Sequence, residues 1–300
     1  MSPESITSAT AVVAACAAAA GGWLARGSTA VPAAVWAAVA ALALAAEAAG
    51  RAGGWLVDPA TRSATRLAVA ALAVCPAMSL LGAKRPQHGV WQLIVGTLAF
   101  VLALPAASAL LVRPGSLPDI HALERFFLPL LVAVGWMNFI ATRRGLAATL
   151  VAGGQLGLIW PFLPGVAADR PLSATMEMAC GGAIAAGAIG AVIQSIRGTR
   201  RRVGGGLAQA VDPPYLALRE TLGAAWALRI CERFNGLATE RGWACRLRFA
   251  GLEGDLPVGP SSREVLRCFR SIVRRFASPA WIARHGGLGL PEGGRGRPEV

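Results

Sequence analysis

Two glutamates, Glu47 and Glu177, lie near the ends of apolar stretches of the sequence. A carboxylate deep in a bilayer is costly and marks a substrate or ion site by default, whereas one near the interface can reach the aqueous surface. Each glutamate therefore either snorkels to the interface or joins a shared polar site, with Arg113 or Arg125 as partners. Gln155 is the third candidate for that site, although amides in membrane bundles more often bridge helices.

A row of arginines near the C-terminus is the second candidate site. The segment 261–276 places them at steps of four, three and four, opposite an apolar face, at Arg263, Arg267, Arg270 and Arg274. This basic face is a solvated helix surface, a surface for anionic lipid headgroups, or a surface for nucleic acid. Nucleic acid is the weakest of the three, because no aromatic stacking platform accompanies the cations.

Catalytic and metal-binding patterns do not accompany these residues. The six cysteines form no CxxC pair, and the sequence has no GxSxG turn or HExxH helix. We therefore expect no catalytic residue, no metal and no cofactor, and a protein that is not an enzyme.

The elements that must position these side chains are long apolar segments. The hydrophobic fraction is 55% and charged residues make up 15%, against roughly 25% in soluble domains. About 20 apolar residues span a bilayer, and seven segments approach that length. They are residues 6–25, 29–49, 66–83, 90–112, 123–141, 146–163 and 174–196. The sequence thus predicts an α-helical, multi-pass bundle of about seven spans over residues 1–196, in contact with the lipid bilayer.

The last apolar segment carries small residues at helical spacing. Gly182, Ala186 and Gly190 recur every four residues, and Gly187 belongs to a second, adjacent row. Small residues let helix backbones approach closely in lipid. We expect these positions to pack helices together, within the chain, in a homo-oligomer or against another membrane protein.

Arginines immediately after the last span indicate the sidedness of the chain. Cations flanking a span stay on the cytoplasmic side, and four of them lie between Arg197 and Arg202. Counting back through seven spans places the N-terminus outside and the C-terminus in the cytoplasm, in a cell (inner) membrane. Arg51 and Arg62, in a loop expected outside, oppose this assignment, and Arg66 at a span boundary would do the same.

The pattern of the C-terminal region predicts a small cytoplasmic α/β domain of helix, strand and helix over residues 212–285. Asp212 caps a helix that runs to Gly242, alternating residues 243–252 form a strand, and a capping box opens the last helix at Ser261. Residues 252–258, or another chain, would pair with that strand. A basic, glycine-rich linker (197–211) precedes the domain, and a disordered segment (286–300) follows it.

These features favour a non-enzymatic membrane protein that anchors a basic interaction domain. The alternative is a small-solute or ion transporter, or a transporter subunit, with an outer-side polar site near Glu47 and Glu177.

Overall fold

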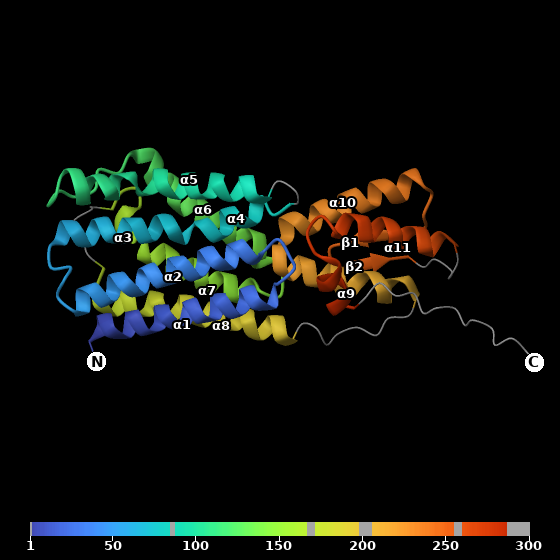
Figure 1. The fold of residues 1–300 in the computed structure, drawn as a ribbon, viewed down its shortest axis with the longest axis horizontal. Coiled ribbons are helices and arrows are strands. Elements are labelled where there is room, and N and C mark those ends of the chain that lie inside the picture. Colours follow the sequence, from blue (N-terminus) through green and yellow to red (C-terminus); the bar gives the residue numbers. More distant parts are fainter. Residues whose placement is uncertain (1, 85–87, 167–171, 198–205, 255–259, 287–300) are drawn as a thin grey trace, which may run out of the picture.

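The computed structural model describes residues 2–84, 88–166, 172–197, 206–254 and 260–286. A helical bundle occupies one end of an elongated molecule, and a smaller C-terminal domain occupies the other (Figure 1). Residues 198–205, which make up most of the predicted linker, and residues 287–300 of the predicted disordered segment lie outside the described residues.

The bundle consists, among the described residues, of eight α-helices, one short π-helical segment (η1) and one 3-10 turn (η2). They are α1 (Pro3–Leu24), α2 (Val31–Ala52), α3 (Pro59–Ala73), α4 (Cys75–Leu81), α5 (His88–Ala107), η1 (Ser108–Val112), α6 (Ala122–Ile140), α7 (Gly145–Leu158), η2 (Trp160–Phe162) and α8 (Ala174–Arg197). Counting α3 and α4 as one, six helices in the described part of the chain are long and apolar enough to cross a membrane. The seventh predicted span corresponds to α7, which has only 14 residues. The count of seven spans therefore stays a prediction.

Helix α3 begins two turns earlier than the sequence pattern predicts. Asp58 caps it by accepting a 2.8 Å hydrogen bond from the Thr61 amide, and Pro59 occupies the first turn. The boundary predicted at residue 66 is therefore wrong, and Arg66 lies inside the helix. Helix α3 ends at Ala73 because Pro76 has no amide hydrogen to continue the ladder.

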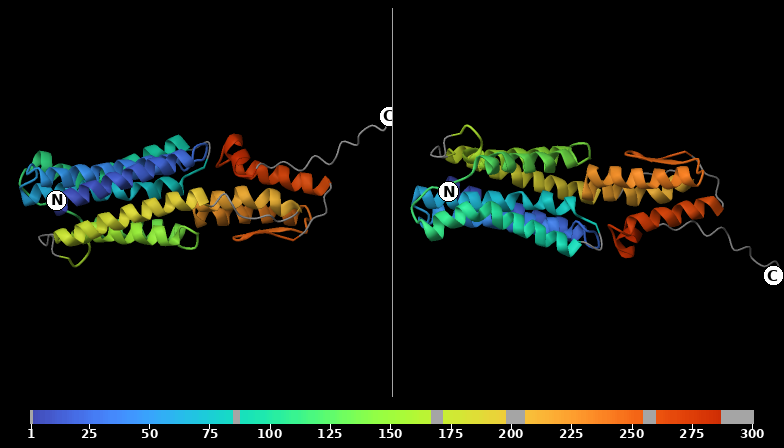
Figure 2. Two further views of the ribbon diagram at one scale, coloured as in Figure 1. Left: turned by 90° about the horizontal axis from the view of Figure 1, so that it is seen from below. Right: turned by 90° about the horizontal axis from the view of Figure 1, so that it is seen from above.

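The helices run up and down between the two ends of the bundle. The N-terminus and the turn between α2 and α3 lie at the end remote from the C-terminal domain, whereas the turn between α1 and α2 lies beside that domain (Figure 1). Seen from the side, α1–α5 form one layer and α6–α8 a second (Figure 2). Helix α8 packs against both α1 and α7, so it joins the two layers.

The small residues of α8 make different contacts. A Cβ atom added at Gly187 would lie 2.7 Å from the Ala147 carbonyl oxygen of α7, so only glycine fits there. At Gly190 the nearest atom is the Ala147 Cβ at 3.8 Å, and at Gly182 nothing lies within 4 Å. Ala186 is exposed. Gly187 therefore packs helices within the chain, and Gly182 and Ala186 face outward.

The C-terminal domain contains four helices and one two-stranded hairpin among the described residues. They are α9 (Gly206–Leu222), α10 (Ala224–Glu240), β1 (Arg246–Arg248), β2 (Gly251–Glu253), α11 (Pro260–Val273) and α12 (Pro279–Arg284). Residues 206–211, expected in the linker, thus belong to α9.

The first helix predicted for this domain is divided in two. The prediction of one helix from Asp212 to Gly242 is wrong, because Gly223 adopts φ +87° and separates α9 from α10. Asp212 lies inside α9 rather than capping it, and its Oδ1 accepts a 2.7 Å hydrogen bond from the Leu252 amide of β2. The aspartate therefore holds the hairpin against α9.

The strand prediction is confirmed in part. Residues 246–248 are extended, but they pair antiparallel with 251–253 of the same chain, with Leu247 opposite Leu252. The start of the last helix is also shifted: α11 begins at Pro260, so Ser261 lies inside it rather than capping it.

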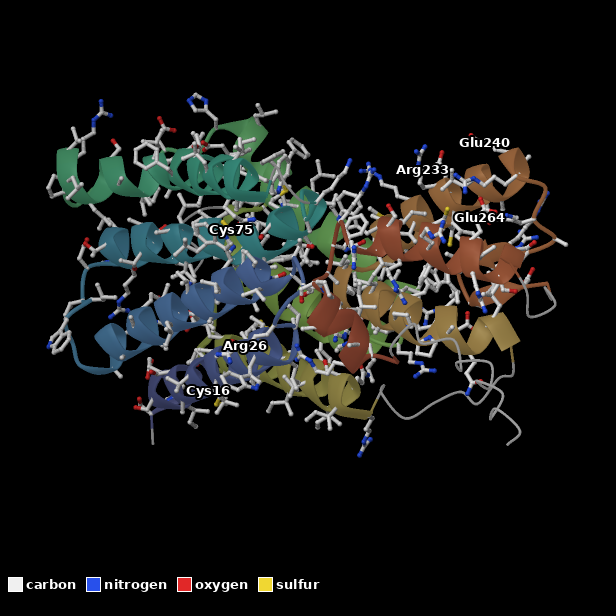
Figure 3. All side chains as sticks on the ribbon, turned by 45° about the vertical axis from the view of Figure 1, so that its right-hand side comes forward. Cys16, Arg26, Cys75, Arg233, Glu240 and Glu264 are labelled. Atoms are coloured by element: carbon white, nitrogen blue, oxygen red, sulfur yellow. The ribbon has the colours of Figure 1, made fainter. Side chains whose placement is uncertain are left out.

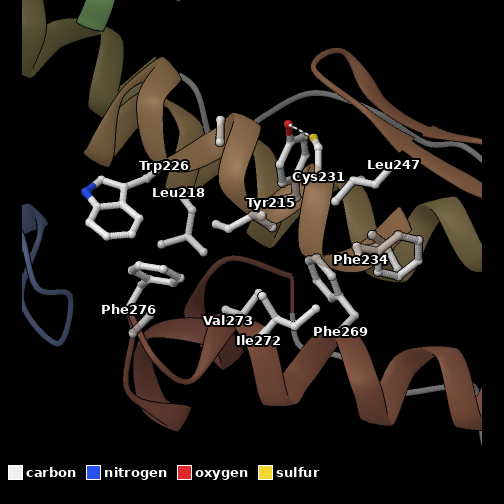
Figure 4. Packing of buried hydrophobic residues seen from close by; sticks show 14 of the residues in the cluster. Tyr215, Leu218, Trp226, Cys231, Phe234, Leu247, Phe269, Ile272, Val273 and Phe276 are labelled. Atoms are coloured by element: carbon white, nitrogen blue, oxygen red, sulfur yellow. Dashed lines mark hydrogen bonds between the residues drawn. The ribbon is translucent and has the colours of Figure 1, made fainter. Parts of the chain in front are cut away.

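Aromatic side chains fill the core of the C-terminal domain (Figure 4). The rings of Trp226 and Phe276 lie 5.0 Å apart between centroids. The Tyr215 hydroxyl lies 3.0 Å from the Cys231 sulfur, and burial raises the pKa of Tyr215 far above its usual range. The core continues into the bundle, because Ala30, Leu80 and Ala83 belong to the same cluster of buried residues. The two parts of the molecule therefore share one hydrophobic core.

Candidate functional sites

Four charged side chains meet among α2, α3 and α8, at the bundle end remote from the C-terminal domain. Arg66 Nη2 lies 2.9 Å from Glu47 Oε2 and 3.2 Å from Glu177 Oε1. Arg51 Nε lies 3.1 Å from Glu47 Oε1, and Arg51 Nη1 donates to Glu177 Oε2. Each carboxylate is thus shared by both guanidinium groups. We call Glu47, Arg51, Arg66 and Glu177 the ion network.

The ion network is buried and electrically neutral. Its side chains are between 3% and 11% exposed. Two guanidinium groups balance two carboxylates, which offsets the large cost of moving isolated charges out of water. Helices α2 and α3 are consecutive in the sequence, but α8 is distant from both, since Glu47 and Glu177 lie 130 positions apart by their numbers. The ion network therefore connects α2, α3 and α8 at the bundle end that is remote from the C-terminal domain.

The structure brings Glu47 and Glu177 together but places Gln155 elsewhere. Gln155 Nε2 donates a 2.8 Å hydrogen bond to the Ala73 carbonyl, at the break between α3 and α4. It also lines a hollow of about 220 Å³ between α4, α6, α7 and α8, whose lining is mostly apolar and includes neither glutamate. Gln155 thus bridges two helices of the bundle.

The two arginines that the sequence analysis expected as partners of Glu47 and Glu177 are not their partners in the structure. Arg113 is exposed, and Arg125 Nη1 donates to the Val166 carbonyl at 3.4 Å. The actual partners are Arg51 and Arg66, which the sequence pattern places in a loop and at a span boundary. The helix signal of Asp58 and Pro59 could have located Arg66 two turns inside α3.

The C-terminal domain docks on the bundle through backbone and side-chain hydrogen bonds. The turn between α1 and α2 pairs with residues 276–278: Thr29 N donates to the Phe276 carbonyl at 2.8 Å, and Ser278 N donates to the Gly27 carbonyl at 2.7 Å. Trp226 Nε1 donates to the Leu80 carbonyl at the end of α4, also at 2.7 Å. Bonds to three separate bundle elements, α6 included, fix the orientation of the domain.

Asn138 of α6 contacts the domain where α9 meets α10. Its Nδ2 donates to the Leu222 carbonyl and its Oδ1 accepts from the Ala225 amide, both at 3.0 Å. These are the backbone groups on either side of Gly223, where a Cβ atom would lie 2.2 Å from Asn138 Nδ2. The glycine therefore serves two purposes: it permits the positive φ between α9 and α10, and it lets Asn138 approach.

The basic face of α11 is exposed at all four arginines, Arg263, Arg267, Arg270 and Arg274. Helix α11 runs along the long axis of the molecule, with its C-terminal end beside the bundle (Figure 2). Helix α11 has 14 residues and is about 20 Å long. The distance between the bundle and each arginine therefore increases along the helix toward its N-terminal end. Within this row, the Arg274 end is the one that lies near the bundle.

Three further arginines, which sequence reasoning missed, lie beside this face. Arg233 of α10, Arg241 just after α10 and Arg275 just after α11 line one hollow of about 180 Å³. Arg241 Nη1 pairs with Glu264 Oε1 of α11 at 2.5 Å, and Figure 3 shows Arg233 and Glu264 on these two neighbouring helices. The sequence did carry a signal for this grouping, because Arg233, Leu237 and Arg241 follow one another at steps of four residues and so share one helix face.

Searches for similar proteins give no further assignment: no family model, no curated protein and no solved structure matches this chain.

Proposed function

We propose that this protein is a non-enzymatic membrane protein that holds a basic interaction domain in a fixed position at the cytoplasmic face of a cell membrane. The observation that carries this proposal is the docking of the C-terminal domain on the bundle. A domain that shares a core with the bundle, and is hydrogen-bonded to three of its elements, cannot rotate freely. The exposed arginines of the domain are therefore held at a fixed distance from the bundle and in a fixed orientation relative to it.

The distribution of cations supports the cytoplasmic placement. Arg26, Lys84 and Arg143 lie at the bundle end that carries the domain, and no acid accompanies them in the turns that hold them. Of the three cations that opposed this sidedness, Arg51 and Arg66 are paired with Glu47 and Glu177, whereas Arg62 is exposed and still opposes it. Acids contribute little to orientation, so the weight rests on the cations, above all on the four arginines from Arg197 to Arg202 that follow the last span. The N-terminus is therefore proposed to lie outside.

The direction of α11 favours a protein partner over a lipid surface. A flat layer of headgroups would contact the Arg274 end of the basic face and leave Arg263 about 16 Å farther away. Anionic headgroups stay a possible partner for that end alone. A folded acidic surface, in contrast, could contact the whole row.

Cysteine labelling tests the sidedness. Cys16 and Cys268 are replaced by serine, since the other four cysteines are buried, and single cysteines are introduced at Leu117 and Ala141, which are exposed at opposite ends. A membrane-impermeant maleimide added to intact cells should label Leu117→Cys and not Ala141→Cys. The reverse pattern would refute the cytoplasmic placement.

Photocrosslinking tests the interaction itself. A crosslinking amino acid at Arg267 should give one discrete adduct in intact cells, and changing Arg263, Arg270 and Arg274 to glutamine should abolish it. The same amino acid at Arg246, exposed on the hairpin, is the matched control. Failure to obtain an adduct at any position of the basic face would reject an interaction function.

Transport is the second candidate, favoured by the burial of four charged side chains among helices. Charged residues inside a membrane bundle frequently line an ion or proton pathway. Here the ion network would act as a closed outer gate above the hollow lined by Gln155. Purified protein in liposomes should then pass protons or small ions, and Glu47→Gln with Glu177→Gln should change the rate. Liposomes with no added conductance would exclude this candidate for those solutes.

A further inference from the structure

The groove between α10 and α11 has the composition of an anion site. Its lining combines three guanidinium groups, from Arg233, Arg241 and Arg275, with the Ser271 hydroxyl. The hollow measures about 180 Å³. Leu237 and Ile272, which belong to the domain core or pack against it, supply the apolar part of the lining.

Two of the three guanidinium groups have no counter-ion in the described part of the chain. Arg241 is paired with Glu264, but neither Arg233 nor Arg275 forms an ion pair or a side-chain hydrogen bond with any described residue. Both are exposed. Like charges held around one hollow repel each other, and an anion placed between them removes that repulsion. The groove is therefore poised to bind a negative ligand.

The arrangement favours a phosphoryl group over a carboxylate. An arginine fork binds two oxygens of an oxyanion in a bidentate contact. A carboxylate presents only two oxygens, which lie in one plane. A phosphoryl group presents three oxygens in a pyramid, so it can accept from Arg233 on one wall, Arg275 on the other and the Ser271 hydroxyl.

We propose that this groove binds a phosphate ester or a pyrophosphate. The ligand comes either from a soluble phosphate compound or from a lipid headgroup. Arg233 lies nine residues beyond the start of α10 at Ala224, about 14 Å farther from the bundle. Arg275, on the other wall, directly precedes Phe276, whose carbonyl accepts from Thr29 of the bundle, so the groove extends from the bundle end outward and the test below separates the two sources. The groove would bind its anion whether or not the basic face also recruits a protein.

Inorganic pyrophosphate is the probe for the test. The full-length protein is placed in nanodiscs of neutral phosphatidylcholine, and binding is measured by titration calorimetry. The wild-type chain should bind one pyrophosphate saturably. The double variant Arg233→Gln, Arg275→Gln should bind at least tenfold more weakly, and Ser271→Ala should weaken binding by a smaller factor.

The matched control is the double variant Arg246→Gln, Arg263→Gln. It removes the same charge from exposed positions of the same domain outside the groove, and should keep its affinity within about threefold. Equal weakening in both double variants would show a response to net charge alone and overturn the proposal. So would the lack of saturable binding by the wild-type chain. Unchanged thermal unfolding without ligand confirms that the variants fold.

Nanodiscs containing phosphatidic acid identify the source of the phosphoryl group. A headgroup that occupies the groove should compete with pyrophosphate and lower its apparent affinity at least tenfold. Unchanged affinity assigns the groove to a soluble phosphate compound. Both results require phosphoryl recognition by Arg233 and Arg275, so each supports the site and names its source.

Discussion

Arg66 binds Glu47 across the gap between α3 and α2, with Nε 3.2 Å from Oε2 and Nη2 3.1 Å from Oε1. The same Nη2 reaches Glu177 of α8 at 3.2 Å. One side chain thus connects three helices, and its removal leaves two buried carboxylates with a single remaining cation, Arg51.

We therefore expect Arg66→Gln to destabilise the bundle strongly. Breaking one partner out of a buried ion pair costs about 3–5 kcal/mol, because the charge left behind is uncompensated. Unfolding of the purified protein in mixed detergent micelles measures the loss. The control is Arg113→Gln, an exposed arginine outside the ion network, which should cost about 0.5 kcal/mol or less.

Charge balance can be restored within the ion network. The double variant Arg66→Gln, Glu177→Gln leaves one guanidinium and one carboxylate, Arg51 and Glu47, which already lie 3.1 Å apart. It should therefore be more stable than Arg66→Gln alone. A double variant less stable than either single change would mean that the side chains matter for packing rather than for charge.

Gly187 and Gly182 allow a closely packed and an unpacked glycine to be compared on one helix. Alanine at Gly187 would meet the Ala147 carbonyl oxygen and a Val151 methyl group, each at 2.7 Å. Overpacking of this kind costs about 1–3 kcal/mol. Alanine at Gly182 meets nothing within 4 Å and should be neutral or slightly stabilising, because alanine favours helix. Thermal unfolding in detergent compares the two, and similar losses at both positions would contradict the contacts between α7 and α8.

Asn138→Ala should loosen the docking of the C-terminal domain. It removes hydrogen bonds to the Leu222 carbonyl and the Ala225 amide, each worth about 1 kcal/mol. Hydrogen exchange at Ala225 should become faster by roughly tenfold. Asn235→Ala is the control: it frees Leu247 of the hairpin, to which Asn235 bonds at 2.8–2.9 Å, and should leave exchange at Ala225 unchanged.

His285 should make the stability of the C-terminal domain fall in mild acid. Its ring stacks on Trp281 at 3.9 Å between centroids, and burial lowers the pKa of His285 below its ordinary value of 6.5. The folded side chain stays neutral where the unfolded chain already binds a proton. Its contribution is therefore complete above pH 6.5 and is lost as the pH falls through that value toward the lowered pKa.

Thermal unfolding at about pH 7.5 and about pH 5.5 measures this dependence. His285→Gln removes the titrating group and should make the difference between the two temperatures smaller. An unchanged difference would assign the acid sensitivity to other groups.

The sequence alone determined the apolar segments and the faces of the C-terminal helices. Hydrophobic periodicity is a local property, so the spacing of Val265, Phe269 and Val273 suffices to predict that they share a buried helix face. The same local signals found the end of α10, where Gly242 adopts φ +66°. They failed at Gly223, because a glycine within a helical pattern is compatible with both a continuous helix and a break.

Only the tertiary structure decided which of these residues meet. Glu177 contacts Arg66 because α8, packed against α1 and α7, brings its first turn within side-chain reach of α3, and no spacing in the sequence encodes that neighbourhood. Arg233 and Arg275 line one groove for the same reason, since the hairpin and α11 return the chain along α10. Helix pairing depends on the fit of whole faces, such as Gly187 against Ala147, and such a fit exists only once both helices are in place.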